Sequence, residues 1–231
     1  MKRLVISTGA GMSAESGIST FRDAGGLWEN YPVMDVCSAD GFIRNPALVH
    51  KFYNERRAQL VNCKPNAGHI ALAELESRFD VKIITQNVDD LHERAGSSHI
   101  LHLHGELMKI RAVDDPDYIE DVTEETMETT PETRGRNGML MRPHIVFFQE
   151  AVPNIAPAME LASEADIFVV IGTSLQVYPA AGLIDCVRPG VPIYYIDPRP
   201  AHVSGVPNLT VIPEPATKGV ATLARLLKEK H

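Results

Sequence analysis

The stretch Arg3-Leu4-Val5-Ile6-Ser7-Thr8-Gly9-Ala10-Gly11-Met12-Ser13-Ala14 decides the fold of this 231-residue chain. Residues 3–8 are typical of a buried strand, and a GxGxxA motif follows them directly. Glycines at a strand end let backbone N–H groups approach a phosphate, and a helix beginning there would add its positive dipole end. A tight strand–helix turn without any ligand has the same pattern. The position after the first strand favours a nucleotide site.

Further strands and helices alternate along the chain. This alternation predicts an α/β fold, with a mostly parallel sheet covered by helices on both faces. The strands, apolar runs rich in Val and Ile, are expected at 3–8, 81–85, 100–104, 144–148, 166–171, 192–196 and 209–212. The helices are expected at 46–62, 66–79, 154–163, 180–187 and 218–230. Asn45-Pro46 favours a helix start there, with Asn as the N-cap and Pro at the first helical position.

Composition restricts the function classes. The chain is 44% hydrophobic and 23% charged, which is ordinary for a globular protein with a sizeable core. Its formal net charge of −8 argues against nucleic-acid binding, which needs clustered Lys and Arg. Cys37, Cys63 and Cys186 are too scattered for a disulfide framework or a four-cysteine zinc site and favour a reducing compartment. The apolar start is too short for a signal peptide, and no run approaches the ~18 apolar residues of a membrane span, so we expect a cytoplasmic protein without membrane contact.

Residues 112–133 interrupt this regular pattern. They contain nine Asp and Glu residues and no Lys or Arg, so the rest of the chain sums to a formal charge of +1. We call them the acidic segment. The composition predicts a solvated, poorly packed excursion. A cation-binding loop is the alternative, but the spacing matches no calcium-loop pattern.

Several motifs beyond the glycines give the chain a family resemblance. Glu15–Trp28 (ESGISTFRDAGGLW) continues the glycine motif, and the later motifs are TQNVDDLH at 85–92, LHGE at 103–106, RPHIVFF at 142–148 and GTS at 172–174. Together they resemble the sirtuin family of NAD-dependent protein-lysine deacylases over nearly the whole chain. The resemblance implies NAD as the cofactor and acylated-lysine proteins or peptides as substrates. The acidic residue usually found about 20 positions after such glycines, following a second strand, is missing, so the chain is not an ordinary dehydrogenase.

The resemblance also implies a domain division. A Rossmann-like NAD-binding domain would comprise residues 1–20, 65–106 and 143–231. Two insertions, 21–64 and 107–142, would form a small lobe that contains the cofactor loop, a helical part and the acidic segment. Neither motifs nor composition indicate an oligomeric state.

The resemblance assigns catalytic roles to individual residues. His104 matches the general base; His102 shares its face of the expected strand, and only the LHG context distinguishes the two. Gln86 and Asn87 would work around the nicotinamide ribose, and Asp89 would hold the nicotinamide carboxamide. From the residues alone, Asn87 or Asp89 could instead cap a helix. Further cofactor contacts are implied at Gly9, Ala10, Gly11, Ala14, Phe21, Arg22, Gly172, Thr173, Ser174 and Asp197.

The resemblance implies acyl transfer to the cofactor, with nicotinamide, O-acyl-ADP-ribose and free lysine as products. Tyr53 and Arg56 would be neighbours on the helix at 46–62. Arg56 falls in or beside the apolar stripe of that helix, where an internal salt bridge, a snorkelling stem or a substrate carboxylate would each satisfy it. The pair resembles the Tyr-x-x-Arg motif of the desuccinylase/demalonylase branch, in which Cys37 would stand at the small residue that widens the acyl pocket. Other substrate contacts are expected at Val146, Phe148 and Val177.

We therefore expect removal of succinyl and malonyl groups, and of acetyl groups as well. The alternatives are an acetyl-only deacetylase, a sirtuin-like NAD hydrolase and a non-catalytic nucleotide-binding module. Nicotinamide release without any acyl peptide would favour the hydrolase. Binding of NAD without turnover of any acyl peptide would favour the module.

The chain departs from the family in its small lobe. Most sirtuins carry four zinc-binding cysteines between the catalytic histidine and the Arg-Pro strand, but residues 105–141 contain neither Cys nor His, so we expect no structural zinc. The lobe would instead be packed by Met108, Ile110, Val113, Tyr118, Ile119, Val122 and Met127. Smaller departures are Gln149 in place of a glycine and Asp197 in place of an asparagine.

Overall fold

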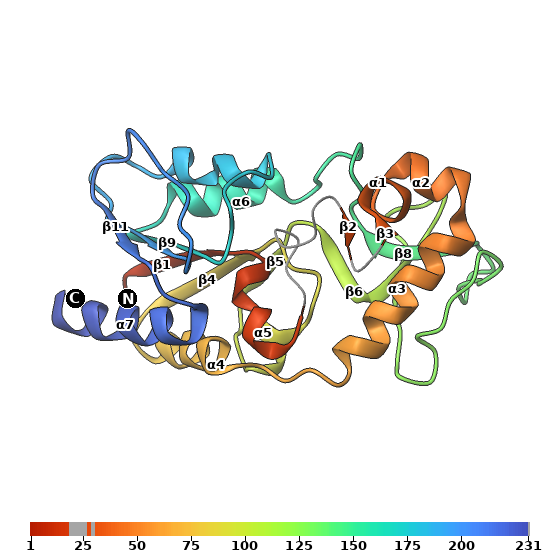
Figure 1. The fold of residues 1–231 in the computed structure, drawn as a ribbon, viewed down its shortest axis with the longest axis horizontal. Helices are drawn as coiled ribbons and strands as arrows, with labels where there is room; N and C mark the ends of the chain where they lie inside the picture. Colours follow the sequence, from red (N-terminus) through yellow and green to blue (C-terminus); the bar gives the residue numbers. More distant parts are fainter. Residues whose placement is uncertain (19–26, 29–30, 231) are drawn as a thin grey trace.

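The computed structural model describes residues 1–18, 27–28 and 31–230 (Figure 1). Its main body is built on a six-stranded sheet in the order β11-β10-β9-β1-β4-β5, in which every neighbouring pair is parallel. The strands are β1 (Arg3–Thr8), β4 (Asp80–Thr85), β5 (Ile100–His102), β9 (Ile167–Ile171), β10 (Ile193–Ile196) and β11 (Leu209–Ile212). The chain runs outward from β1 to β5, returns to the other side of β1 with β9, and continues outward to β11. The predicted Rossmann-like parallel sheet is confirmed.

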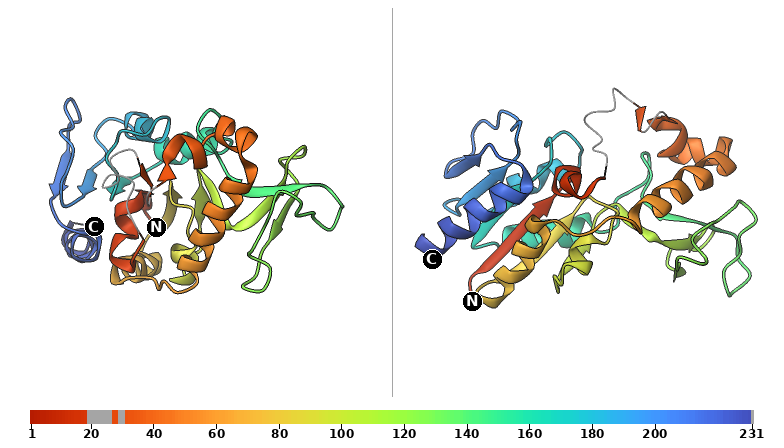
Figure 2. Two further views of the ribbon diagram at one scale, coloured as in Figure 1. Left: turned by 45° about the vertical axis from the view of Figure 1, so that its right-hand side comes forward. Right: turned by 60° about the horizontal axis from the view of Figure 1, so that its bottom comes forward.

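Side-chain alternation along β1 explains why helices cover both faces of the sheet. Leu4 and Ile6 point into one layer, where they meet α4 (Ala67–Glu74) and α7 (Ala216–Lys230). Val5 points into the opposite layer, against α6 (Ile155–Ser163) and the 3₁₀ helix η5 (Ala180–Cys186). All three side chains are fully buried, as expected of a central strand in a parallel sheet. Figure 2 shows both layers, with the start of β1 and the end of α7 at one end of the molecule.

A second body packs around an antiparallel sheet in the order β7-β6-β8 (Figures 1 and 2). Phe52 and Tyr53 of its long helix, α3, pack with Leu107, Ile145 and Phe147 in one apolar cluster. The Asn45 side chain caps α3, accepting from the Leu48 N–H at 3.0 Å, as predicted. The elements of this body are α1 (Val33–Val36), α2 (Ala39–Arg44), α3 (Pro46–Leu60), β2 (Leu27–Trp28), β3 (Tyr31–Pro32), β6 (Gly105–Ala112), β7 (Ile119–Asp121) and β8 (Met141–Ile145).

Several predicted element boundaries are corrected by the structure. The strand expected at 100–104 ends at His102, because Leu103 and His104 form a bend that turns into β6. The strand expected at 144–148 is β8, which begins and ends three residues earlier. The helix expected at 66–79 ends as the 3₁₀ turn η4 (Leu75–Ser77), and the one expected at 180–187 is entirely 3₁₀. The glycine motif leads into two 3₁₀ turns, η1 (Ala10–Met12) and η2 (Ala14–Ser16), so it has no α-helix dipole behind it.

The acidic segment is better packed than its composition predicts. It includes the end of β6 and all of β7, and its Val122 is buried in a small cluster with Ile110 and Met141. Most of the residues that were expected to pack the lobe do so. Ile110 and Val122 belong to this cluster, and Met108, Tyr118 and Met127 pack against it. Val113 and Ile119 do not, since each is 42% exposed.

Arg57 of α3 anchors the far end of the acidic segment, and sequence reasoning did not single it out. Its side chain is fully buried. It donates to the carbonyl oxygens of Leu107 (2.8 Å) and Met127 (3.0 Å), and to side-chain oxygens of Asn54 (3.0 Å) and Thr129 (3.2 Å). All four partners are neutral oxygen atoms, and burial lowers the pKa of Arg57 to about 10. One guanidinium thus ties α3 to β6 and to residues 127–129.

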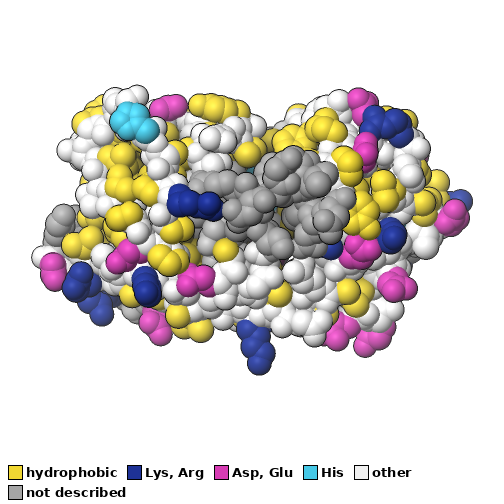
Figure 3. Space-filling model, viewed as in Figure 1, with side chains coloured by type: hydrophobic (Ala, Val, Ile, Leu, Met, Phe, Trp, Pro, Cys, Tyr) yellow, Lys and Arg dark blue, Asp and Glu magenta, His cyan; other side chains and the backbone are white. Residues whose placement is uncertain are grey.

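The charged surface is mixed. On the face shown in Figure 3, Lys and Arg side chains are scattered among Asp and Glu rather than gathered into one basic patch. Within the part of the chain that the structure describes, no helix has the length and apolar character needed to cross a membrane.

Candidate active site

The glycine motif lies where the sheet order reverses, between β1 and β9. In doubly wound sheets this point opens a crevice at the carboxyl ends of the strands, where ligands bind. The Gly9 N–H donates to the Ile171 carbonyl at 2.9 Å, and the Gly11 N–H to the Gly172 carbonyl at 2.8 Å. A Cβ at Gly11 would lie 2.6 Å from the Gly172 Cα, closer than real Cβ atoms come. The close backbone contact between the two loops therefore requires glycine at position 11. Gly172 has a φ of +63°, a left-handed conformation that also favours glycine.

Ser13 connects the loop after β1 to the loop after β4. Its hydroxyl donates to the Asp89 carboxylate at 2.9 Å and accepts from the Asn87 side-chain amide at 3.1 Å. A third partner, His69 Nε2, lies 3.5 Å away; His69 Nδ1 accepts from the Asn66 N–H, so Nε2 carries the ring proton. The single donor and both acceptor positions of this buried hydroxyl are used. Sequence reasoning missed Ser13, although it stands inside the glycine motif.

Asp89 is a buried carboxyl group, 6% exposed. Burial raises its pKa to about 6, partly opposed by the bond from Ser13. Its second oxygen accepts from the Leu91 N–H at 3.2 Å, at the beginning of α5 (Leu91–Arg94). The helix-capping alternative is not realised, because the N-cap of α5 is Asp90. One Asp89 oxygen nevertheless accepts from the first helical N–H, while the other accepts from Ser13.

His104 is held by the backbone of Gln86, because its Nδ1 lies 3.1 Å from the Gln86 carbonyl oxygen. A carbonyl only accepts, so Nδ1 carries the proton and the lone pair of the neutral ring is on Nε2. Burial lowers the pKa of His104 below its ordinary value, partly opposed by the Gln86 bond. The ring is therefore neutral at pH 7, with one nitrogen able to accept a proton.

Asn87 is fixed by three hydrogen bonds. Its backbone N–H donates to the Thr85 hydroxyl at 3.0 Å, and its side-chain amide donates to the Gly9 carbonyl and to Ser13, both at 3.1 Å. The Thr85 hydroxyl in turn accepts from the Thr8 hydroxyl at 2.9 Å. Thr8 and Thr85 are register partners at the ends of β1 and β4. The sequence held a signal for this hydrogen bond, because the two strands expected at 3–8 and 81–85 both end in threonine.

The other predicted cofactor residues are spread along the same edge of the sheet. Thr173 is buried and lies 3.4 Å from the Gln86 amide, while Ser174 beside it is half-buried. Asp197 is buried after β10 and accepts from the Arg199 N–H at 2.8 Å. Ala10 is half-buried and Ala14 exposed. Phe21 and Arg22 lie outside the described residues.

The predicted acyl-pocket residues Tyr53 and Arg56 lie in the middle and second half of α3, and Tyr53 contacts Cys37. Tyr53 is 1% exposed, and its hydroxyl lies 3.6 Å from the Cys37 sulfur. The Arg56 guanidinium stacks over the Phe52 ring at 4.7 Å and lies 3.6 Å from Glu55. Burial raises the pKa of the Cys37 thiol to about 11, while the Tyr53 bond and the Arg56 charge oppose this rise. Burial also raises the pKa of Tyr53 well above its ordinary value, so the phenol stays protonated.

The chain after β8 links this cluster to His104. The Val146 N–H donates to the His104 carbonyl at 2.9 Å, and the Phe148 N–H donates to the Cys37 carbonyl at 2.8 Å. Phe148 itself is 41% exposed. Gln149, for which the resemblance implied a glycine position, has a φ of +77°, and its amide bonds to Asp40 on α2 at 2.8 Å. Val177 is half-buried, in the loop between β9 and η5.

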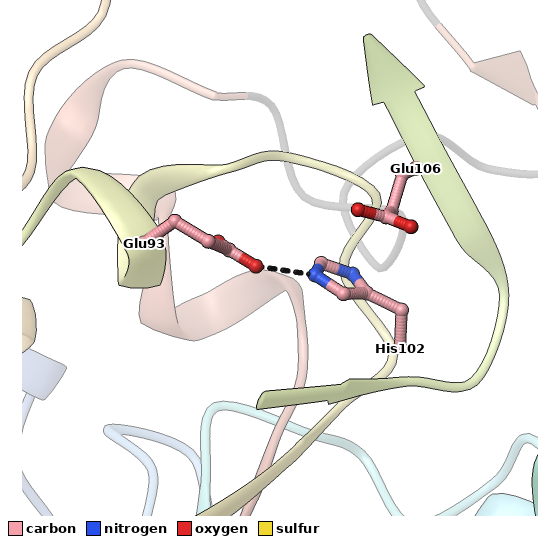
Figure 4. A group of neighbouring side chains, drawn as sticks. All are labelled: Glu93, His102 and Glu106. Atoms are coloured by element: carbon pink, nitrogen blue, oxygen red, sulfur yellow. Dashed lines mark hydrogen bonds and ion pairs between the residues drawn. The ribbon is translucent and has the colours of Figure 1, made fainter. Parts of the chain in front are cut away.

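These residues fit a dinucleotide. Close backbone at the switch point, an oriented amide, a buried carboxyl group and a neutral histidine all lie at the carboxyl ends of parallel strands. A metal fits less well. Among the described residues, one group of three possible ligands lies within 4.8 Å: Glu93, His102 and Glu106 (Figure 4). His102 is already bonded to Glu93 at 2.7 Å, and Glu106 is paired with Lys109 at 2.9 Å.

Comparison with known proteins agrees with this site. The Sir2 family model matches residues 9–179. An NAD-dependent protein deacylase of Bacteroides thetaiotaomicron is 55% identical over 230 residues, covering 98% of each chain. One from Helicobacter pylori is 49% identical, covering 99% of each.

Solved structures give the same result. A Sir2 homologue in complex with NAD superposes with a TM-score of 0.87 at 37% identity, covering 99% of this chain and 90% of that one. A Sir2 variant in complex with a p53 peptide and NAD gives 0.81 at 29% identity, covering 98% and 94%. The motifs, the sheet order and these matches agree that the chain belongs to the Sir2 family.

Proposed function

We propose that this Sir2-family enzyme, an NAD-dependent protein deacylase, prefers lysines that carry a succinyl or malonyl group and also removes acetyl groups. Three features support the proposal: a dinucleotide crevice, a neutral histidine beside it, and an arginine–tyrosine pair next to that histidine's loop. The products would be nicotinamide, O-acyl-ADP-ribose and free lysine.

NAD supplies the ribose carbon that loses nicotinamide and receives the acyl oxygen. The chain supplies position and proton transfer. His104 is the proposed general base: its Nδ1–H is fixed on the Gln86 carbonyl, so Nε2 accepts the proton of a ribose hydroxyl. Asn87, held by Gly9 and Ser13, presents an oriented amide to the same ribose. Asp89 would bind the nicotinamide carboxamide from within a water-poor site.

The observation that carries the acyl preference is the meeting of Tyr53, Arg56 and Cys37. Arg56 and Tyr53 stand one turn apart on α3, and Arg56 is only 13% exposed. The Tyr53 hydroxyl contacts the Cys37 thiol, and the Arg56 charge is close enough to oppose the rise in the pKa of that thiol. A dicarboxylic acyl group would place its free carboxylate there, with Arg56 giving charge-assisted bonds and Tyr53 a neutral donor. Cys37, a small side chain, leaves room for the longer acyl chain.

The substrate peptide is proposed to run beside residues 146–148. Bonds to the His104 and Cys37 carbonyls fix the backbone of this segment, and Phe148 remains exposed to contact a partner. The acyl-lysine side chain would then enter between His104 and α3.

The test is a panel of acetyl-, malonyl-, succinyl- and glutaryl-lysine peptides of one sequence, incubated with NAD and followed by mass spectrometry. We expect a higher kcat/KM for the succinyl and malonyl peptides than for the acetyl peptide. The reverse order would support an acetyl-only deacetylase. Nicotinamide release at the same rate without peptide would support an NAD hydrolase.

A further inference from the structure

Two histidines hold two successive carbonyl groups of the loop after β4. His104 Nδ1 lies 3.1 Å from the Gln86 oxygen, and His102 Nδ1 lies 3.2 Å from the Asn87 oxygen. The rings differ at the other nitrogen. His102 Nε2 lies 2.7 Å from a carboxylate oxygen of Glu93 on α5, as Figure 4 shows.

The partners of His102 determine its charge. A backbone carbonyl and a carboxylate both accept hydrogen bonds and donate none. Both bonds therefore exist together only when both ring nitrogens carry a proton, that is, when His102 is an imidazolium. His104 has a single acceptor and stays neutral. The two rings, two residues apart, thus occupy opposite protonation states.

The charges around His102 are consistent with this state. Burial works to lower the pKa of His102, but the bond and charge of Glu93 outweigh it, so the pKa lies above the ordinary value. The charge of Glu106 adds to this rise. His102 in turn lowers the pKa of the buried Asp89. The ionisable groups that interact electrostatically with the ring are Glu93 and His92 on α5, Glu106 on β6, Asp89 in the loop after β4, and His144 on β8; Lys109 on β6 is paired with Glu106.

We infer that His102 is a positioning residue for the reaction, whose imidazolium links Glu93 to the Asn87 carbonyl and holds the Asn87 side chain at the nicotinamide ribose. The inference rests on the proposed role of Asn87. His104 and His102 fix neighbouring peptide units, so the general base and the ribose-binding amide keep one relative position. When the ring loses its second proton, the remaining proton favours the Glu93 carboxylate, so the bond to the Asn87 carbonyl is lost and Asn87 is held only by its N–H and side-chain amide.

Kinetics across a pH range provide the first test. In the wild type, kcat/KM for NAD should fall as pH rises through the raised pKa of His102. His102→Gln should lose about tenfold in kcat/KM near neutral pH and show no further fall at higher pH. Glu93→Gln should move the fall to lower pH, because it removes the carboxylate that favours the imidazolium.

Two variants serve as matched controls. His99→Gln makes the same substitution at an exposed histidine three residues earlier and should leave the profile unchanged. Glu106→Gln removes a carboxylate near the ring but not bonded to it, so it should move the profile less than Glu93→Gln. Circular dichroism and thermal melting confirm that each variant folds.

NMR titration of ¹³C-labelled histidine, together with calorimetric NAD binding, tests the inference without acyl turnover. The His102 resonance should titrate above the ordinary histidine range in the wild type and lower in Glu93→Gln. A His102 ring that is neutral at pH 7 would overturn the inference, and so would an unchanged pH profile in His102→Gln. If no acyl peptide is turned over but the titration and NAD binding respond as described, the acyl proposal fails and the positioning role stands.

Discussion

The Ser13 hydroxyl donates to the Asp89 carboxylate across 2.9 Å and joins loops that are 76 residues apart in the chain. Both side chains are almost completely buried. The bond therefore fixes the carboxyl group proposed for nicotinamide against the loop that carries the glycine motif. It only partly offsets the burial that raises the pKa of Asp89 to about 6.

The raised pKa of Asp89 predicts a pH-dependent stability. The folded-state pKa lies above the unfolded value of about 3.9, so the stability that it contributes is present below about pH 4 and is lost as pH rises through 6. Relative to Asp89→Asn, the wild type should lose roughly 2 kcal/mol of unfolding free energy between pH 4 and pH 7. Urea denaturation at both pH values measures this difference. The exposed Asp114→Asn serves as the control, and a difference between wild type and Asp89→Asn that does not vary with pH would contradict the prediction.

Protonation of the proposed base, His104, should lower activity at acidic pH. Because burial lowers the pKa of His104, wild-type activity should rise with pH below about 6.5 and be complete at neutrality. His104→Ala should reduce kcat by roughly 10²–10⁴ with NAD binding retained. Steady-state assays and calorimetry measure the two quantities. His202→Ala, at an exposed histidine, is the control, and full activity of His104→Ala would remove His104 as the base.

Arg56→Met should separate the acyl substrates. Loss of the proposed charged partner should cost about 2–5 kcal/mol in kcat/KM for the succinyl-lysine peptide, which is thirtyfold or more, with little change for the acetyl peptide. Tyr53→Phe should act in the same direction but more weakly, because it removes a neutral donor. Arg44→Met on α2, an exposed arginine, is the matched control. Equal losses on both peptides would argue against a substrate carboxylate at Arg56.

Arg57→Met should destabilise the second body. Met removes the guanidinium donors from the carbonyls of Leu107 and Met127 and from the side-chain oxygens of Asn54 and Thr129. We expect a loss of about 2–4 kcal/mol in unfolding free energy. In Arg57→Met, the increase in backbone hydrogen exchange over the wild type should be largest at residues 127–129. Lys51→Met, on the exposed side of the same helix, should change neither quantity.

The parallel sheet was predictable because its strands are continuous apolar runs, and a strand buried on both faces has no other pattern. The antiparallel sheet was not predicted. In β6 (GELMKIRA) polar and apolar residues alternate only imperfectly, and β7 lies within the acidic segment. Acidic composition indicated solvation there, but a few apolar contacts and one buried arginine were enough to order it.

The site was predictable as a set of motifs but not as a network. The resemblance named His104, Asn87 and Asp89 without indicating that Ser13 connects two of them. Arg57 had a signal of its own, since it lies four residues after Tyr53 and eight after Val49, on one buried line of α3. Sequence reasoning normally places an arginine on the exposed face of a helix. The burial of Arg57 is explained by its four oxygen partners, which the sequence does not reveal.

The central place of β1 has a consequence for biosynthesis. β1 is synthesised before both of its partner strands, and one of them, β9, ends only at Ile171. At ordinary translation speeds, roughly 10–30 s pass before both edges of β1 are paired. During that interval the β9 edge of β1 is unpaired, and Leu4, Val5 and Ile6 lack the apolar side chains of β9 that later pack beside them. The growing chain therefore carries this apolar strand with one edge unpaired until β9 has been synthesised.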